Sequence, residues 1–369
     1  MKLLVVGTDR KLFEEKSSVR SRMLFLAEKF EEVHIIVFST KKSKLENQKI
    51  NNLFLYPTSS ISKFFYILDA YKISKKISQP SIVSSQDPFE TGLTGYFIAN
   101  FFKVPLQIQI HTDFLAESFG FNILNIIRRT IAYFILSKAS GIRAVSSVLA
   151  QKIKQRYKLK NSPDVLPVFI DSESILNKKP SFFTKNIYPQ FSEVILMASR
   201  ITKEKNIDLA IKSFAKILKK MPKTGLLISG QGPESDNLKT LSQKLGISDS
   251  VVFLGWQNDL VSWMKTSDVF LQTSFYEGYG MSFVEAALSG CPIVTTSVGL
   301  AGEVCKDGQN SFVISGGEDE LSNKLLGILS NQNLRLSFRQ EMNNDIRNIF
   351  YTKEKYSETY FDLYSKLIK

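Results

Sequence analysis

The chain has 369 residues, of which 43 % are hydrophobic and 22 % charged, so it is long enough for two or three domains and apolar enough to give each a core. This composition excludes a largely disordered chain. The net charge of +13 favours anionic partners such as acidic lipid headgroups or phosphorylated substrates, but no nucleic-acid-binding motif is present, and we expect no nucleic-acid partner.

The amino-terminal sequence MKLLVVGTDRK is not typical of a signal peptide, because its apolar run is short and charges follow at once. The most apolar long stretch, residues 119–138, is interrupted by Arg128 and Arg129 and does not reach the roughly 18 apolar residues of a membrane span. The two cysteines, Cys291 and Cys305, do not indicate a disulfide framework and fit a reducing compartment. We therefore expect a cytoplasmic protein.

The first half of the chain alternates short β-branched runs with helical patterns. The predicted strands are residues 3–7, 33–39, a run near 81, 106–113, 141–146 and 163–171. Strands that alternate with helices form a parallel sheet with helices on both faces. Residues 172–191 then lose this periodicity, and lysines and prolines punctuate them, so we interpret them as an interdomain linker.

The alternating pattern restarts at residue 193. The predicted strands of this second part are residues 193–199, 225–230, 251–255, 269–274, 292–297 and 311–315, and the tail from about 334 is helical. The sequence therefore predicts two α/β units of similar size. Ligands of such sheets bind beyond the carboxyl ends of the strands, so we expect a cleft between the units.

Three strand-to-helix junctions of the second unit carry candidate chemistry. Arg200 and Lys205 lie in the first, MASRITKEKNIDLA, where two cations at a positive helix end suit a diphosphate. A solvated basic loop would show the same pattern. Gly230 and Gly232 lie in the second, LLISGQGPES, where glycines let the backbone approach a ligand or make a tight turn without one.

The third junction, SFYEGYGMSFVEA, carries two glutamates. Glu277 precedes two glycines in the loop, and Glu285 lies about one turn into the following helix among apolar residues. A carboxylate in such a setting needs strong hydrogen-bond donors, and one carboxylate can hold both hydroxyls of a ribose diol. A glutamate stabilised by the positive end of its helix is the competing interpretation for Glu285.

In this order the three junctions resemble the retaining glycosyltransferases of family 4, also called group 1, which have the GT-B fold. The run GCPIV at residues 290–294 adds to the likeness, which extends through nearly all of residues 193–315. The resemblance implies an α/β protein of two doubly wound, Rossmann-like domains facing each other across a cleft. It predicts an acceptor domain at 1–185, a nucleotide-sugar domain at 186–350, and a last helix, about 351–369, that packs back on the first domain.

The resemblance also implies roles for the charged residues. Glu277 would hold hydroxyls of the donor sugar, and Glu285 would hold the ribose diol. Arg200 and Lys205 would stabilise the diphosphate leaving group, since fixed cations lower the barrier where negative charge builds up. Enzymes of this kind need no metal, and the sequence contains no Asp-x-Asp motif, so we expect neither a metal nor another cofactor.

The remaining site residues follow from the same resemblance. Backbone N–H groups of the loop would contact the donor, and other backbone segments would line its phosphate and base pockets. These residues are Gly230, Gly232, Gly255, Trp256, Gly278, Tyr279, Gly280 and Met281.

The amino-terminal half matches the family more loosely. His111 ends a predicted strand and would lie by the reacting carbon, whereas His34, inside the run VHIIVF, is interpreted as structural. The family often has a glycine pair after its first strand for phosphate and acceptor contacts, but only Gly7 is present here. The usual Asn-Gly before the family's aspartate is replaced by Val168 and Phe169. Both departures concern the acceptor side.

From these features we predict a retaining glycosyltransferase that moves a hexosyl unit from a UDP- or GDP-sugar to a glycan or lipid-linked acceptor, in cell-surface polysaccharide or glycolipid synthesis. The alternative is a catalytically silent relative that binds membrane or glycan. Residues 63–76 and 119–138 combine aromatic, apolar and basic residues, which fits helices lying on an anionic membrane surface at the inner face of the cell membrane. Core helices with lysine stems at their edges fit the same pattern, and the sequence leaves this choice open.

Overall fold

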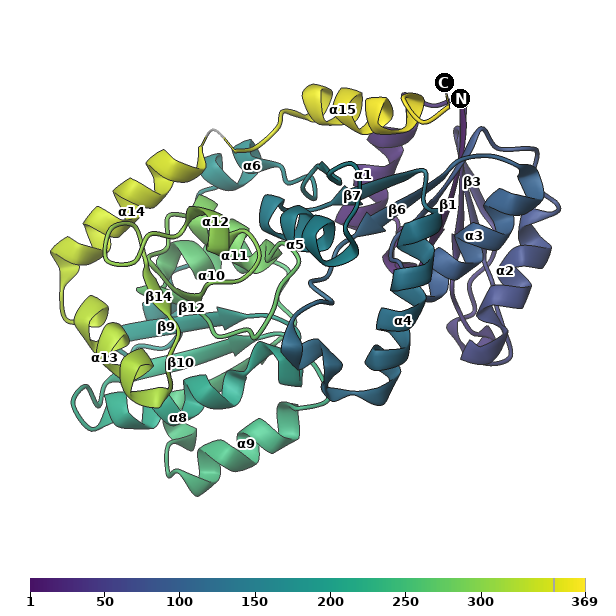
Figure 1. The fold of residues 1–369 in the computed structure, drawn as a ribbon. Helices are drawn as coiled ribbons and strands as arrows, with labels where there is room; N and C mark the ends of the chain where they lie inside the picture. The colour runs from purple at the N-terminus through teal and green to yellow at the C-terminus, as the bar shows by residue number, and fades with distance from the viewer. Residues whose placement is uncertain (348, 369) are drawn as a thin grey trace. The chain divides into compact units, whose positions relative to one another are not determined.

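The computed structural model of the protein describes residues 1–347 and 349–368 (Figure 1). The chain divides into two compact units. Unit 1 consists of Met1–Phe169 together with Tyr351–Lys369, and unit 2 consists of Ile170–Phe350. The chain therefore leaves unit 1, builds the whole of unit 2, and returns to unit 1.

Unit 1 is built on a sheet that has eight strands within the described residues, in the order β3-β4-β2-β1-β5-β6-β7-β8. Only β3 and β4 pair in antiparallel fashion there; the other neighbours are parallel. The strands are β1 (Lys2–Gly7), β2 (Glu32–Val37), β3 (Gln48–Ile50), β4 (Leu53–Pro57), β5 (Ile82–Ser85), β6 (Leu106–Ile110), β7 (Gly141–Ala144) and β8 (Asp164–Val165). The sequence predicted no strand between residues 39 and 81, so β3 and β4 were missed.

Helices cover both faces of this sheet. On one side, α2 (Tyr66–Ser74), α3 (Glu90–Phe102) and α4 (Ile123–Lys138) pack next to one another in that order (Figure 1). Helices α1 (Ser18–Ala27) and α15 (Lys353–Ser365) contact each other, and their apolar residues form one core with Leu3 and Val5 of β1. Helix α5 (Ser147–Tyr157) joins β7 to β8. Because side chains alternate along a strand, Leu4 and Val6 point to the other face, and both are fully buried.

Helix α15 is tied to the sheet by polar as well as apolar contacts. Arg143 of β7 is buried, and its guanidinium donates hydrogen bonds to Leu166 O, Pro167 O, Gln109 Oε1 and the Tyr356 hydroxyl, at 2.8–3.0 Å. Gln109 Nε2 in turn donates to the Tyr364 hydroxyl, at 3.1 Å. The acceptors around this buried cation are all uncharged. A network of this kind is stable only when each member is satisfied, so α15 completes the core of unit 1.

Unit 2 contains a sheet with six strands in the part of the chain that the structure describes, in the order β11-β10-β9-β12-β13-β14, and its strand pairs are parallel. The strands are β9 (Glu193–Ala198), β10 (Thr224–Ser229), β11 (Val251–Gly255), β12 (Val269–Gln272), β13 (Ile293–Thr296) and β14 (Phe312–Ile314). The helices are α6 (Ser172–Asn177), α7 (Thr184–Ile187), α8 (Ile207–Leu218), α9 (Ser235–Lys244), α10 (Leu260–Thr266), α11 (Met281–Leu288), α12 (Ala301–Val304), α13 (Glu318–Leu329) and α14 (Gln332–Ile346).

The segment predicted as a linker is part of unit 2. Lys178 bonds to Asp259 at 2.6 Å, Thr184 bonds to Thr266, and the ring of Phe182 packs edge-on against Trp263 at 4.8 Å between centroids. These contacts attach α6 and α7 to α10. The division between the compact units falls between residues 169 and 170, whereas the sequence predicted a domain boundary between residues 185 and 186.

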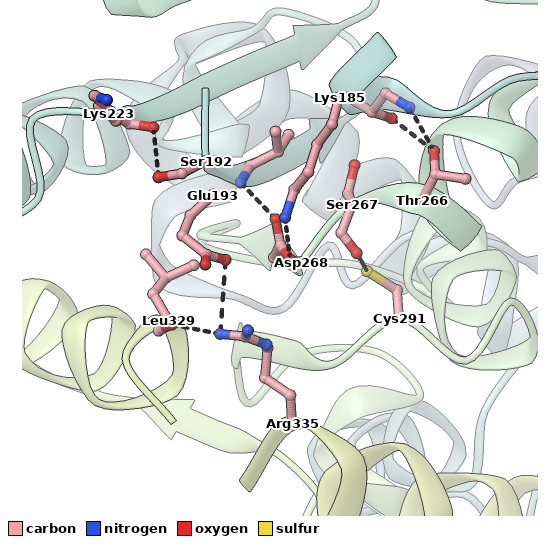
Figure 2. A network of polar contacts seen from close by, with 12 residues as sticks. Lys185, Ser192, Glu193, Lys223, Thr266, Ser267, Asp268, Cys291, Leu329 and Arg335 are labelled. Carbon is pink, nitrogen blue, oxygen red and sulfur yellow. Dashed lines mark hydrogen bonds and ion pairs between the residues drawn. The ribbon is translucent and has the colours of Figure 1, made fainter. Parts of the chain in front are cut away.

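A polar network closes the amino-terminal edge of the unit 2 sheet (Figure 2). Asp268 accepts hydrogen bonds from the Val194 N–H at 2.8 Å and from Lys185 Nζ at 3.1 Å, while Arg335 lies 3.7 Å from Glu193. Burial, and then the neighbouring Asp268 carboxylate, raise the pKa of Glu193 above its ordinary value. Since these residues lie where β9 and β12 begin, they are at the edge opposite to the strand-to-helix loops, and we assign the network to stability.

Within the described residues, none of the helices combines the length and the apolar character that crossing a bilayer requires.

Candidate active site

The candidate site of unit 2 is formed by the loops that follow the carboxyl ends of its strands. Glycines bring three of these loops together. Gly230 after β10 has φ of +131°, its N–H donates to Gly255 O at 2.8 Å, and a Cβ on it would lie 1.8 Å from Ser199 O. A Cβ on Gly232 would lie 2.1 Å from Ile201 O. Both glycines are therefore required by the packing of loop against loop, whatever further contact they make with a ligand.

An ion pair links the first and third predicted junctions. Lys205 ends a short 3₁₀ helix (Lys203–Lys205) before α8, and its Nζ lies 2.5 Å from Glu277 Oε1. Only 12 % of the Lys205 side chain and 15 % of the Glu277 side chain are exposed. Ser274 Oγ donates a second hydrogen bond to the same carboxylate oxygen at 2.8 Å. The structure thus brings together two of the four predicted catalytic residues.

Two neighbouring contacts fix the loops that carry this ion pair. The Thr273 hydroxyl lies 2.9 Å from both Lys205 O and Asn206 O, and Asn206 has the left-handed conformation with φ of +52°. The Phe275 N–H donates to Glu204 O at 2.9 Å. The end of β12 therefore determines the position of the turn that presents Lys205. Sequence reasoning missed Thr273 and Ser274, although two hydroxyl residues stand between a buried strand and Glu277.

Arg200 is held less firmly than Lys205. Its guanidinium pairs with Glu204 at 3.4 Å, and 75 % of the side chain is exposed. An exposed pair of this kind contributes little and constrains the side chain weakly. No contact in the described structure joins Arg200 to Glu277. Arg200 therefore lies at the rim of the site, and its exposed side chain is free to change rotamer.

The loop from Gly278 to Met281 leads into α11. Gly280 has φ of +87° and is the N-cap of the helix, and the Leu300 N–H donates to Tyr279 O at 2.8 Å. This hydrogen bond joins the loop to the segment after β13. The first N–H groups of a helix point toward its amino end and favour negative charge there. The start of α11 therefore adds positive potential beside Glu277.

Glu285 lies in the second turn of α11, between the buried residues Val284 and Ala286. Burial raises the pKa of its carboxyl to about 7. In the described part of the chain, this carboxylate makes no hydrogen bond or ion pair. A largely buried carboxylate without a donor is costly, and the vicinal hydroxyls of a ribose would satisfy it.

Gly255 and Trp256 follow β11. Gly255 has φ of +68°, and its carbonyl accepts the Gly230 N–H described above. Trp256 is 61 % exposed, and its Nε1 donates to Asn258 Oδ1 at 3.2 Å. The structure thus places both residues at the carboxyl edge of the same sheet, one loop away from Gly230.

His111 belongs to unit 1 and follows β6 at the carboxyl edge of its sheet. Gln109 Oε1 already accepts from Arg143, so His111 Nε2, at 3.1 Å from the same oxygen, must carry its hydrogen and donate it. This tautomer leaves Nδ1 as an acceptor. Burial, followed by the guanidinium groups of Arg143 and Arg22, lowers the pKa of His111 to about 3. The imidazole is therefore neutral at physiological pH.

Gly7 ends β1 at the same edge of unit 1. A Cβ on it would lie 2.4 Å from the Gln86 side-chain oxygen, which accepts the Thr8 N–H at 3.0 Å. The glycine is therefore explained by the space that Gln86 occupies. His34, predicted to be structural, stacks on Phe54 at 4.6 Å between ring centroids and bonds to Glu32 and Tyr56.

In the residues that the structure describes, no cluster of three or more His, Cys, Asp or Glu side chains is arranged to hold a metal ion.

The two units, each built on a mainly parallel sheet, have the GT-B architecture. HepE of Anabaena, in a crystal structure with UDP and glucose, superposes on 99 % of this chain and 100 % of its own, with a TM-score of 0.79 and 19 % identity. Residues 178–345 of the chain match the family model of the glycosyl transferases group 1. This match confirms the resemblance predicted from the sequence, and the structural likeness confirms the predicted GT-B fold.

Two relatives of known name are similar in sequence. The alpha-monoglucosyldiacylglycerol synthase of Streptococcus pneumoniae is 29 % identical over 241 residues, which is 61 % of this chain and 53 % of the relative. The N-acetyl-alpha-D-glucosaminyl L-malate synthase of Bacillus anthracis is 25 % identical over 267 residues, covering 71 % and 68 %. The match thus spans about half the length of the first relative.

Proposed function

We propose that the protein transfers a hexosyl unit from a nucleoside-diphosphate sugar, with UDP or GDP as the nucleotide, to a glycan or lipid-linked acceptor and retains the anomeric configuration. The observation that carries this proposal is the ion pair between Lys205, which precedes α8, and Glu277, which precedes α11. The unpaired Glu285 lies in the second turn of α11. The pair matches a ligand that carries an anionic leaving group and sugar hydroxyls side by side.

In the proposed reaction, the bond between the anomeric carbon and the diphosphate oxygen breaks, and a bond to the acceptor oxygen forms on the same face of the sugar. The acceptor proton goes to the departing diphosphate oxygen. Lys205, Arg200 and the N–H groups at the start of α11 stabilise the negative charge that develops on the diphosphate, in place of a metal ion. Glu277 exchanges its bond to Lys205 for hydroxyls of the donor sugar, and Glu285 holds the ribose.

The backbone of the neighbouring loops completes the proposed donor site. The segment from Gly278 to Met281 and the turn at Gly230 and Gly232 face the phosphates, and the loop at Gly255 and Trp256 lines the base pocket. Neutral His111 contacts the donor sugar through its free acceptor nitrogen, and Gly7 lies on the acceptor side.

The lipid-linked acceptor is the part of the proposal that concerns localisation. A relative carries the name of a synthase of alpha-monoglucosyldiacylglycerol, which is a glycolipid, and this chain has a net charge of +13, which favours anionic membranes. We infer a cytoplasmic enzyme that works at the inner face of the cell membrane in glycolipid or surface-polysaccharide synthesis.

Donor hydrolysis without acceptor tests the site. We expect Lys205→Ala and Glu277→Ala each to lower turnover by about 100-fold or more, the loss typical of removing one group that stabilises transition-state charge. Lys203→Ala is the matched control, because Lys203 lies in the same 3₁₀ helix and is exposed. Wild-type turnover in both variants would show that the site is wrongly assigned. Calorimetry with a panel of UDP- and GDP-sugars identifies the donor.

A further inference from the structure

Large apolar side chains are exposed where α2 begins. Phe64 is 93 % exposed, and its neighbours Ile61, Phe65 and Leu68 are exposed as well. They lie in and beside a 3₁₀ turn (Lys63–Phe65) that runs directly into α2. The inner side of this helix already buries Ala70, so the exposed residues are additional to those that pack on the sheet.

The start of α4 shows the same feature. Ile123 is 77 % exposed, and Leu124, Ile126 and Ile127 are exposed beside it, whereas Ala132, Ile135 and Leu136 supply the buried side. The two arginines of this segment turn toward the protein. Arg128 pairs with Glu90 of α3 at 2.9 Å, and Arg129 Nε donates to Phe114 O at 2.8 Å. The outer surface of the first turns is therefore apolar.

Helix α3 connects these two regions, since it packs against α2 on one side and α4 on the other (Figure 1). It exposes Phe97 and Phe101, and Lys75 of α2 lies over the Phe101 ring at 5.4 Å. We call the outer surface of α2, α3 and α4 the three-helix face. Large apolar side chains exposed on three neighbouring helices are the kind of surface that marks an interaction site.

The three-helix face is predominantly positive. Exposed lysines lie on these helices and next to their ends, namely Lys63, Lys72, Lys75, Lys76, Lys103 and Lys138. Among the acidic residues of these helices, Glu90 is neutralised by Arg128 and Asp69 is only half exposed. Apolar side chains together with lysines complement the interface of an anionic bilayer. The apolar side chains insert among the acyl chains, and the lysines bind the phosphate groups.

We propose that the three-helix face docks on an anionic lipid bilayer, with Phe64 and Ile123 at the two deepest points. Helices that follow parallel strands begin at the carboxyl edge of the sheet, so both residues lie at the edge where His111 follows β6. The benefit of docking depends on the proposed function, because a docked bilayer would lie next to the edge of unit 1 that would receive a lipid-linked acceptor. The docking itself requires no activity.

Co-sedimentation with lipid vesicles tests this proposal. We expect the full chain to bind phosphatidylcholine vesicles that contain phosphatidylglycerol, and to bind phosphatidylcholine alone at least about tenfold more weakly. The double variant Phe64→Ser, Ile123→Ser is expected to lower partitioning by about tenfold or more. Leu336→Ser is the apolar control, because Leu336 is exposed on α14 of unit 2.

A charge-matched pair of variants isolates the lysines. Lys72→Glu, Lys75→Glu, Lys76→Glu changes the three-helix face, and Lys219→Glu, Lys220→Glu, Lys223→Glu makes the same change in net charge at exposed positions of unit 2. Only the first triple variant is expected to lose vesicle binding. Equal loss in both would show that overall charge, not this face, binds the lipid, and would overturn the proposal.

Two further outcomes separate docking from catalysis. Donor hydrolysis without lipid is expected to be unchanged in the Phe64→Ser, Ile123→Ser variant. Failure of the wild-type chain to bind anionic vesicles would overturn docking even if hydrolysis persists, whereas vesicle binding without hydrolysis would overturn the proposed function alone. A lipid-free dimer that this double variant dissociates would assign the face to a second copy of the chain instead.

Discussion

The two units share a parallel α/β plan but differ in where they place charge and exposed apolar surface. Unit 2 brings opposite charges together at the carboxyl edge of its sheet, and its large exposed apolar residues lie on separate segments: Leu176, Phe183, Ile187, Leu245, Trp256, Phe275 and Leu336. Unit 1 concentrates its exposed apolar residues on the three-helix face, and its edge holds a neutral histidine beside a buried cation with uncharged acceptors. The same architecture thus gathers opposite charges at a sheet edge in one half and exposed apolar side chains on a helical face in the other.

The largest effect on this comparison is expected from Arg143→Met. The variant leaves Leu166 O, Pro167 O, Gln109 Oε1 and the Tyr356 hydroxyl without their common donor in a buried site. Pro167 O keeps the Tyr356 hydroxyl as a donor, and Gln109 Oε1 keeps His111 Nε2. The four lost hydrogen bonds nevertheless come from a charged group and contribute about 1.5–3 kcal/mol each, so we expect unit 1 to lose about 3 kcal/mol or more of its unfolding free energy. Calorimetry should show an early transition for unit 1 while unit 2 is unchanged. An unchanged thermogram would mean that α15 is held by apolar contacts alone.

The second largest effect is expected from Ser274→Ala in unit 2. Losing a hydrogen bond to a charged group costs about 1.5–3 kcal/mol, which corresponds to roughly a 10- to 100-fold drop in kcat/KM. Because the hydroxyl donates to the Glu277 carboxylate and so positions it, the loss should fall mainly on kcat, and Ser274→Thr should restore most of it. A change in stability without a change in kcat would assign Ser274 a purely structural role.

Glu285→Gln separates stability from donor binding. The folded-state pKa is raised from an ordinary 4.5 to about 7, so the favourable protonated form is lost as pH rises from about 5 through 7. At pH 8 we therefore expect the variant to be more stable than the wild type by about 1–3 kcal/mol, and at pH 4 the two should be equal. Donor affinity should fall at the same time, because the amide holds a diol less well. Titration calorimetry and thermal melts at both pH values measure the two effects.

The smallest effect is expected from Glu193→Gln at the opposite edge of unit 2. Its pKa is raised by burial and by Asp268, so ionisation at neutral pH destabilises the fold, and this penalty is absent once pH falls below the ordinary range of a glutamate. We expect the variant to gain about 1 kcal/mol at pH 7 and to keep wild-type kcat. A loss of stability would show that the contact with Arg335 outweighs the repulsion.

The sequence predicted that Lys205 and Glu277 belong to one site, and the structure brings these two residues together because the signals around them are local. A buried strand, a glycine loop and a helix start follow one another within some fifteen residues around Glu277, and each junction repeats this order. Thr273 and Ser274 were missed because their importance depends on which loop they face, and the contact of Thr273 with Lys205 joins segments far apart in the chain. The grouping of residues 170–185 with unit 2 depends on contacts of the same kind, since Phe182 packs against Trp263 and the segment has no periodicity of its own.

The three-helix face illustrates what a pattern leaves undecided. A helix with apolar residues all round fits a protein core as well as a surface, and the sequence of residues 119–138 did not distinguish them. The structure resolves the choice through Arg128 and Arg129, which are engaged by α3 and by the segment after β6, so that Ile123 and Ile127 face outward. Contacts with residues elsewhere in the chain determine which side of the helix is exposed, and a short stretch of sequence does not contain those residues.

The return of the chain to unit 1 through α15 has a consequence for synthesis on the ribosome. Residues 1–169 emerge first, yet Arg143 and Gln109 receive Tyr356 and Tyr364 only after all of unit 2 has been translated. Unit 2 is continuous in sequence and can fold as soon as it emerges, whereas unit 1 waits with an open sheet face. The half of the protein that is made first is therefore the half that matures last, and it relies longest on chaperones.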